Sequence, residues 1–76
     1  MKELLSFIVK NITASDAFTI DENVDGSKHI YIIRVKPELF GIVIGKEGRT
    51  IKSIRNLAKV RAVVENKSIS VEVDNL

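Results

Sequence analysis

The alternation of apolar and polar positions along the chain predicts three helices and three strands. Helical segments repeat apolar residues about every three or four positions, whereas strand segments alternate them at every second position. In chain order the predicted elements are a helix from Lys2 to about Asn11, a strand from Phe18 to Val24, a strand from His29 to Lys36, a short helix from Leu39 to Ile44, a longer helix from Gly48 to about Glu65 and a strand from Ser68 to Val73. Glu22 falls on the inner side of its strand and is an exception to this pattern.

Residues with turn and capping chemistry separate these elements. Asp25-Gly26 favours a hairpin between the first two strands, and Pro37 suits the first turn of a helix. Gly45 and Asn66 stand where the two later helices should end. The run from Ile30 to Ile33 is continuously apolar, which predicts a central strand whose second face is at least partly covered.

The order of the elements predicts the topology of the fold. The last strand follows the strand from His29 to Lys36 through a two-helix crossover, so these two strands should be parallel with a right-handed connection. The hairpin should place the first strand antiparallel to the central one. The predicted fold is a single α+β domain spanning residues 1–76, with the order α-β-β-α-α-β and a three-stranded mixed sheet that carries its helices on one face.

The most distinctive stretch lies between the two later helices, where Gly45 and Gly48 bracket Lys46 and Glu47. Glycine permits positive φ and the close approach of another backbone. The helix that begins at Gly48 offers free N–H groups and a positive dipole end, and both favour an anion. Lys46 and Arg49 add positive charge at the same place. The stretch therefore predicts a cradle for the phosphates of a nucleic acid.

Charge is unevenly distributed, although the formal net charge is only +2. Residues 1–40 carry five Lys or Arg and six Asp or Glu, whereas residues 46–61 carry six Lys or Arg and only Glu47 as an acid. The positive potential is therefore concentrated immediately after the glycine pair, where a phosphate backbone would be attracted.

The helix from Gly48 to Glu65 has three faces when its residues are placed about 100° apart. The core face contains Ile51, Ile54, Ala58 and Ala62, the basic face contains Arg49, Lys52, Asn56 and Lys59, and the third, apolar face contains Ser53, Leu57, Val60 and Val64. The basic face could be an ordinary solvated surface or a continuation of the phosphate cradle. The apolar face could be covered by the N-terminal helix, or it could bind a second copy of the chain or another protein.

Composition and motifs do not favour an enzyme or a metal site. The chain has no cysteine, and its acidic residues lack the spacing of metal ligands. The stretch from Gly41 to Lys46 is similar to a P-loop, but it is one residue short and Glu47 replaces the required Ser or Thr. His29 is the only histidine and lies in a predicted strand. We expect no catalytic residue, metal or cofactor, and the lack of a signal peptide or membrane span predicts a cytoplasmic protein.

One family combines these features. The chain length, the N-terminal helix and one continuous block resemble the KhpA family of small bacterial single-KH proteins, the block being Gly41-Ile42-Val43-Ile44-Gly45-Lys46-Glu47-Gly48-Arg49-Thr50-Ile51-Lys52. The resemblance implies a type II KH domain, in which the Gly-x-x-Gly loop clamps a short single-stranded RNA. It also implies a cytoplasmic RNA chaperone that pairs with itself and with a larger KH-containing protein, KhpB or Jag. Roles in cell-wall elongation and cell shape are reported for some members.

The resemblance also implies roles for individual residues. The two loop glycines would approach the sugar-phosphate backbone, neighbouring cations would contact phosphates, and Glu47 would project to solvent. Val43 and the last strand around Ile69 to Val71 would border an apolar groove, and Leu57 would lie where the family dimerises. The residues expected to bind RNA are Val43, Gly45, Lys46, Glu47, Gly48, Arg49, Lys52 and Lys59, and those expected at a dimer or partner interface are Ser53, Leu57, Val60 and Val64.

Two other functions remain open from the sequence. The domain could be a protein-interaction module whose loop binds no RNA, or it could bind single-stranded DNA, because a phosphate cradle does not recognise the 2′-OH. No aromatic side chain lies near the loop, so a base-stacking platform is not expected. Few cations and little stacking predict weak, salt-sensitive and sequence-tolerant binding.

Overall fold

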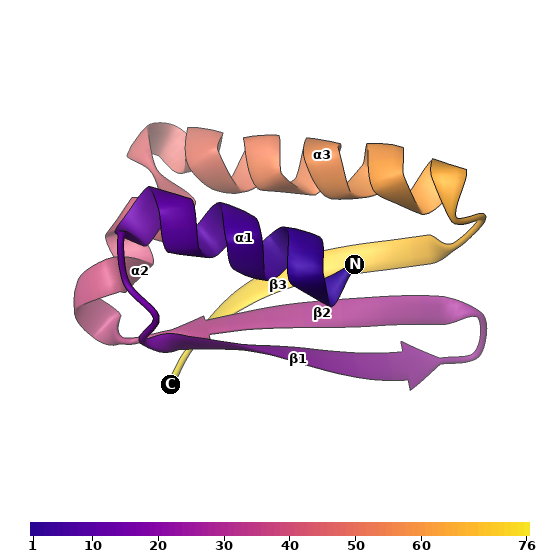
Figure 1. The fold of residues 1–76 in the computed structure, drawn as a ribbon, viewed down its shortest axis with the longest axis horizontal. Helices are drawn as coiled ribbons and strands as arrows, with labels where there is room; N and C mark the ends of the chain where they lie inside the picture. Colours follow the sequence, from indigo (N-terminus) through magenta and orange to yellow (C-terminus); the bar gives the residue numbers. More distant parts are fainter.

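The computed structural model describes residues 1–76 and has the predicted α+β class and element order (Figure 1). Its elements are α1 (Lys2–Thr13), β1 (Phe18–Asp25), β2 (Lys28–Val35), α2 (Pro37–Ile44), α3 (Arg49–Val64) and β3 (Ser68–Asn75). A short 3-10 turn, Lys46–Gly48, lies between α2 and α3 and was not predicted as a separate element. α1 extends to Thr13 because Ala14 is the first residue to leave the helical conformation, at φ 54.

The sheet has the predicted topology. The central strand β2 is antiparallel to β1, from the pair Phe18 and Val35 to the pair Asp25 and Lys28. It is parallel to β3 along its whole length, so β1 and β3 are both edge strands. The hairpin turn consists of Gly26 and Ser27, one residue later than predicted, and Gly26 has φ 62, as the first position of a type II′ turn requires.

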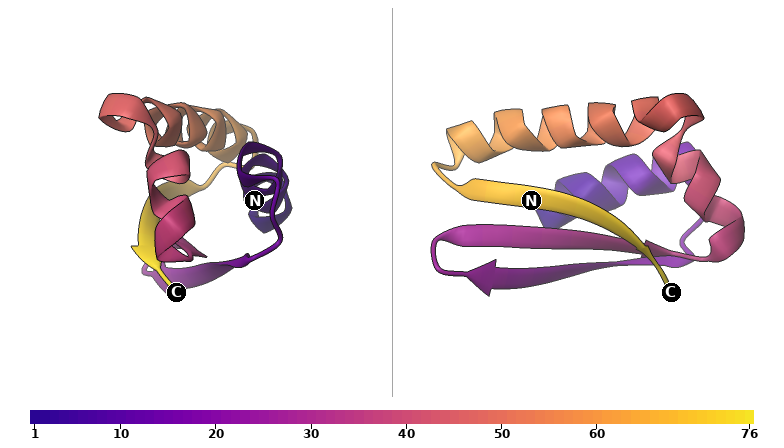
Figure 2. Two further views of the ribbon diagram at one scale, coloured as in Figure 1. Left: turned by 90° about the vertical axis from the view of Figure 1, so that its left-hand side faces the viewer. Right: turned by 180° about the vertical axis from the view of Figure 1, so that it is seen from behind.

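All three helices cover the same face of the sheet, and α3 runs along its length (Figure 2). Alternate residues of β2 meet these helices, and the predicted core face of α3 packs against them. The buried side chains are Leu5, Val9, Tyr31, Ile33, Val35, Val43, Ile51, Ile54, Ala58, Ala62 and Val71. Because this core joins every helix to the sheet, it fixes the position of the loop that precedes α3.

The opposite face of the sheet has no helix on it (Figure 2). Ile30 and Ile32 of β2 are half-buried there, so the second face is covered only to that extent. Arg34 links the three strands on this face, because its Nε donates to Asp21 at 2.6 Å and its Nη1 to Asp74 at 3.2 Å. The sheet therefore presents a solvated, ion-paired surface on the side away from the helices.

The turn from α3 into β3 is a Schellman motif. Asn66 adopts φ 54, the left-handed conformation predicted for the end of this helix. The Asn66 N–H donates to the Val63 carbonyl at 3.1 Å, and the Lys67 N–H donates to the Ala62 carbonyl at 2.9 Å. These bonds satisfy the last carbonyls of α3 and direct β3 back along the sheet, parallel to β2 and adjacent to α3.

Candidate nucleic-acid interface

The loop Gly45-Lys46-Glu47-Gly48 joins the end of α2 to the start of α3, and its backbone favours glycine at both ends. Gly45 ends α2 at φ 78 and ψ 172, a region that residues with a Cβ avoid. Gly48 precedes α3 at φ 74 and ψ 15. Glu47 also has positive φ, 57, which costs a non-glycine residue free energy. Three of the four loop residues therefore have positive φ, which holds the loop in a compact turn.

The N-terminus of α3 has no side-chain cap and no acidic residue in its first turn. The Gly48 N–H donates to the Gly45 carbonyl at 3.1 Å, and the Arg49 N–H donates to the Lys46 carbonyl. No side-chain oxygen accepts a hydrogen bond from the N–H groups that follow. The positive end of the helix dipole is therefore available to an anion from outside the protein.

Cationic side chains extend from the loop along α3, and most of them have no acidic partner. Arg49 is the exception, since its Nη2 lies 3.6 Å from the Glu47 carboxylate. Arg61, which is also on α3, is paired with Glu65 at 2.9 Å and does not belong to this set. The side chains without an ion pair are Lys46, Lys52, Arg55 and Lys59, and we call them the basic track.

Arg55 belongs to the basic track but was not among the predicted site residues. With the residues of this helix placed about 100° apart, Arg55 lies between the core face and the basic face, and it was assigned to neither. Its spacing from Lys52 and Lys59 (i+3 and i−4) could have identified it, because residues at these separations are neighbours on a helix.

Glu47 differs in part from its predicted role. Its side chain is 69% exposed, as expected for a residue that projects to solvent, but its carboxylate contacts Arg49. An acid in that position competes with a phosphate for the same guanidinium. The contact is weak because both side chains are largely hydrated.

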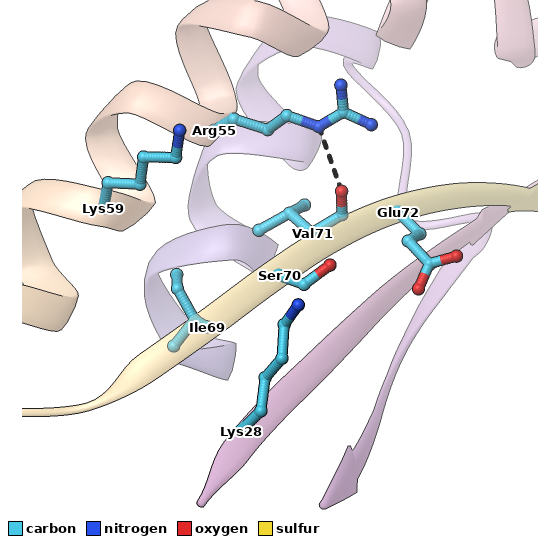
Figure 3. Close-up of a pocket in the computed structure, with 7 residues that line it drawn as sticks. All are labelled: Lys28, Arg55, Lys59, Ile69, Ser70, Val71 and Glu72. Atoms are coloured by element: carbon cyan, nitrogen blue, oxygen red, sulfur yellow. Dashed lines mark hydrogen bonds between the residues drawn. The ribbon is translucent and has the colours of Figure 1, made fainter. Parts of the chain in front are cut away.

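A groove lies between α3 and the free edge of β3, next to the basic track (Figure 3). Its volume is about 280 Å³, and it is lined by Lys28, Arg55, Lys59, Ile69, Ser70, Val71 and Glu72. We call it the α3–β3 groove. The Arg55 Nε donates a 3.0 Å hydrogen bond to the Val71 carbonyl of the edge strand β3. The basic track therefore reaches the wall of a small open cavity.

The structure places two of the predicted groove residues in the groove and the third in the core. Ile69 and Val71 of β3 line the α3–β3 groove as expected. Val43 is 0% exposed, so its side chain supports α2 and the loop from the core and borders no groove. It was assigned to the groove from the family resemblance, but it is the one buried residue of α2.

Comparisons with known proteins agree on the family. The family model described as "KhpA/KhpB, KH domain" matches residues 2–73. The protein named RNA-binding protein KhpA of Clostridium perfringens is 39% identical over 74 residues, covering 96% of this chain and 99% of that protein. The protein of the same name from Thermotoga maritima is 38% identical over 74 residues, covering 96% of this chain and 97% of that protein.

The chain belongs to the KhpA/KhpB family of KH domains. Its curated relatives are named as RNA-binding proteins and not as enzymes, which agrees with the prediction that the chain is not an enzyme. The fold is also similar to part of Era from Aquifex aeolicus, in the crystal structure of a point variant of Era bound to GDP.AlF4⁻. That similarity has a TM-score of 0.67 at 16% identity and covers 97% of this chain and 29% of the Era chain, so it concerns the fold alone.

In this KhpA/KhpB-family domain the third face of α3 is exposed. Leu57, Val60 and Val64 are 54%, 66% and 78% exposed, so α1 does not cover them and that alternative was wrong. Val63, 80% exposed, was not predicted; it lies near Val60 but on the side of the basic face. Ser53 is exposed at the edge of the third face, with its hydroxyl donating to the Arg49 carbonyl. We call Leu57, Val60 and Val64 the apolar α3 face.

His29, the only histidine of this KhpA/KhpB-family domain, is hydrogen-bonded in a cluster with Glu22 and Tyr31. Glu22 accepts hydrogen bonds from the His29 Nδ1 at 2.8 Å and from the Tyr31 hydroxyl at 3.0 Å. The His29 hydrogen bond, followed by that of Tyr31, lowers the pKa of Glu22 below its usual value. Burial and the hydrogen bond to Glu22 raise the pKa of Tyr31 to about 12. This cluster explains why Glu22 occupies the inner side of β1.

The structure contains no group of three or more His, Cys, Asp or Glu side chains that could hold a metal ion. None of its helices is both long enough and apolar enough to cross a membrane.

Proposed function

We propose that this domain binds single-stranded RNA, with the sugar-phosphate backbone on the Gly45–Gly48 loop and the bases over the α3–β3 groove. The observation that carries the proposal is the continuity of the basic track. Lys46, Lys52, Arg55 and Lys59 extend from the loop to the groove, and no acidic side chain of the protein neutralises any of them.

The electrostatics of the loop support contact with phosphates. The uncapped start of α3 offers N–H groups and a positive dipole end, and Lys46 and Arg49 lie next to it. At Gly48 the nearest heavy atom to an added Cβ is 4.0 Å away, so a sugar-phosphate backbone can approach the main chain at this end of the loop. RNA is favoured as the nucleic acid because the curated relatives carry the name RNA-binding protein.

Fluorescence anisotropy with a short labelled single-stranded RNA tests the proposal, at about 50 mM and about 200 mM salt. The variant Lys46→Asp/Glu47→Asp places a negative charge in the loop. The chain offers a matched control, because Lys2→Asp/Glu3→Asp makes the same two substitutions at the start of α1. Circular dichroism confirms that each variant is folded.

We expect salt-sensitive binding by the wild type and by the control, and at least tenfold weaker binding by the loop variant. Equal binding by all three proteins would show that the loop is not the site. A matching DNA oligonucleotide separates RNA binding from general single-strand binding. Failure of the wild type to bind either oligonucleotide would favour a protein-interaction module.

We extend the proposal to a homodimer formed through the apolar α3 face. Three exposed aliphatic side chains on one face of a helix are unfavourable in water, and a second copy of the same face would remove them from it. A dimer would present two loops to one RNA and raise avidity. Pairing with a larger KhpB- or Jag-type protein, RNA-chaperone activity, a cytoplasmic location and a role in cell-wall elongation or cell shape stay predictions from the family resemblance.

A further inference from the structure

The α3–β3 groove contains charged groups that the protein itself leaves unused. Arg55, Lys59, Lys28 and Glu72 all line it, and none of them forms an ion pair. The other arginines of the chain differ in this respect, since each contacts a carboxylate. Unpaired charges gathered in one small cavity point to a ligand with complementary polar groups.

Arg55 is joined to one wall of this groove by a single hydrogen bond. Its Nε donates to the Val71 carbonyl at 3.0 Å, and this one bond directs the guanidinium along the edge of β3 (Figure 3). A guanidinium has five N–H donors in a planar fork, and only the Nε–H is used here. The two terminal nitrogens therefore offer a pair of adjacent donors whose orientation is already set.

Glu72 supplies the opposite chemistry from the other side of the β3 edge, because it pairs with Ile32 on the helix-free face of the sheet (Figure 3). A carboxylate accepts hydrogen bonds, and no Lys, Arg or His of the protein forms an ion pair with Glu72. Ile69, which is half-buried, provides apolar surface next to the charged groups. A volume of about 280 Å³ is just below the range of small-molecule pockets and suits one flat heterocycle.

We infer that the α3–β3 groove binds a guanine base of the RNA, with Arg55 donating to O6 and N7 and Glu72 accepting from N1–H and the 2-amino group. This inference rests on the proposed function. Guanine alone among the four bases has two adjacent acceptors on one edge and two adjacent donors on another. Adenine mixes donor and acceptor on each edge, uracil separates its two acceptors by a donor, and cytosine has a single donor group.

The inference adds one specific position to otherwise sequence-tolerant binding. Phosphate contacts at the loop set the register of the strand, and the groove selects the base that lies over β3. Because the Arg55 Nε is hydrogen-bonded to the Val71 carbonyl, the guanidinium would contact the base that lies next to Val71 on the edge of β3.

Anisotropy titrations with four seven-nucleotide RNAs test this inference, each RNA being all uridine apart from one central G, A, C or U. We expect the guanine RNA to bind about five- to tenfold more tightly, since a bidentate arginine contact discriminates to at least that extent. Replacing the guanine by 7-deazaguanine removes the N7 acceptor, and replacing it by hypoxanthine removes the 2-amino donor. Each replacement should abolish most of the preference.

Arg55→Lys keeps the positive charge but loses the planar fork of N–H donors. Arg61→Lys is the matched control, because Arg61 lies on the same helix and is already paired with Glu65. We expect Arg55→Lys to lose the guanine preference, so that it binds the guanine and uridine RNAs equally, and to become insensitive to 7-deazaguanine. Arg61→Lys should keep the preference. Glu72→Gln provides an independent test, because it should remove the sensitivity to hypoxanthine alone.

Equal affinity of the wild type for all four RNAs would overturn the inference and leave the proposed function intact. Preference for a base other than guanine, or a guanine preference that survives in Arg55→Lys, would overturn it as well. Absence of binding to every RNA would overturn both the inference and the proposed function.

Discussion

Gly45 and Thr50 approach each other so closely that a Cβ atom on residue 45 would overlap the Thr50 side chain and lie 2.8 Å from its backbone nitrogen. The contact joins the end of α2 to the first turn of α3 across the exposed loop. No such contact exists at Gly48, where the nearest heavy atom to an added Cβ is 4.0 Å away. Gly45 is therefore needed both for its positive φ and for the space that Thr50 occupies, whereas Gly48 is needed only for its positive φ.

This difference predicts unequal losses of stability in two variants. Gly45→Ala combines a strained backbone region with the overlap at Thr50 and should lower the free energy of unfolding by more than about 2 kcal/mol. Gly48→Ala incurs only the cost of left-handed φ and should lower it by about 1 kcal/mol. Urea denaturation monitored by circular dichroism measures both. Equal losses would mean that the Thr50 contact relaxes without cost.

The pair formed by Glu47 and Arg49 predicts a gain of function. Glu47→Gln removes an acid that competes with phosphate for Arg49, so RNA affinity should rise by about twofold, in line with the small free energy of an exposed ion pair. Anisotropy at low salt measures the change. Glu3→Gln at the start of α1 is the control for the general gain in net positive charge. An equal rise in both variants would show that Glu47 acts only through net charge.

The fold could be predicted almost completely from the sequence, because each element has a clear period and each boundary has its own chemistry. Pro37, Gly45 and Asn66 each mark a helix end by a local conformational requirement that one residue fulfils. The position of the hairpin turn was wrong by one residue, since Asp25 pairs with Lys28 across the strands instead of entering the turn.

The site was only partly predictable, because its residues are brought together by tertiary packing. The loop residues are contiguous, so the sequence alone indicates that they lie together. Lys28, Arg55 and Glu72 come from three elements, and their meeting at one groove depends on the position of α3 above the edge of β3. Val43 was misplaced for a related reason, since the direction of a side chain on a short apolar helix depends on what packs against it.

The exposure of Leu57 predicts that a charge there changes assembly but not folding. Leu57→Asp should remain folded, because the side chain is 54% exposed, and it should be monomeric if the apolar α3 face forms a dimer. Analytical ultracentrifugation measures the oligomeric state, and thermal unfolding reports the fold. Val24→Asp is a matched control, because Val24 is 60% exposed on β1, the far edge of the sheet. A wild type that is itself monomeric at high concentration would contradict the proposed homodimer.

The cluster of Glu22, His29 and Tyr31 predicts an acid-sensitive contribution to stability. Its hydrogen bonds lower the folded-state pKa of Glu22 below the ordinary value of 4.5, so their contribution is present above about pH 4.5. That contribution is lost as the pH falls through the folded-state pKa. Glu22→Gln should lower the melting temperature at pH 7 and flatten its decline in acid. The Glu3 carboxylate has no hydrogen-bond partner, so Glu3→Gln should leave the decline of the melting temperature in acid unchanged. A decline in Glu22→Gln as steep as that of the wild type would mean that other groups cause it.

The basic track predicts how RNA binding depends on salt. Each phosphate contact on a single strand contributes about 0.7 to the slope of log affinity against log salt concentration, because binding releases the counterions of that phosphate. Lys52 lies on the exposed side of α3 without an ion pair, so Lys52→Gln should reduce the slope by about that amount and weaken every RNA to a similar degree. Lys2→Gln, which removes the same charge from the start of α1, should leave the slope unchanged. A slope that falls equally in both variants would mean that long-range attraction dominates, whereas an unchanged slope in Lys52→Gln would place the RNA backbone away from this side of α3.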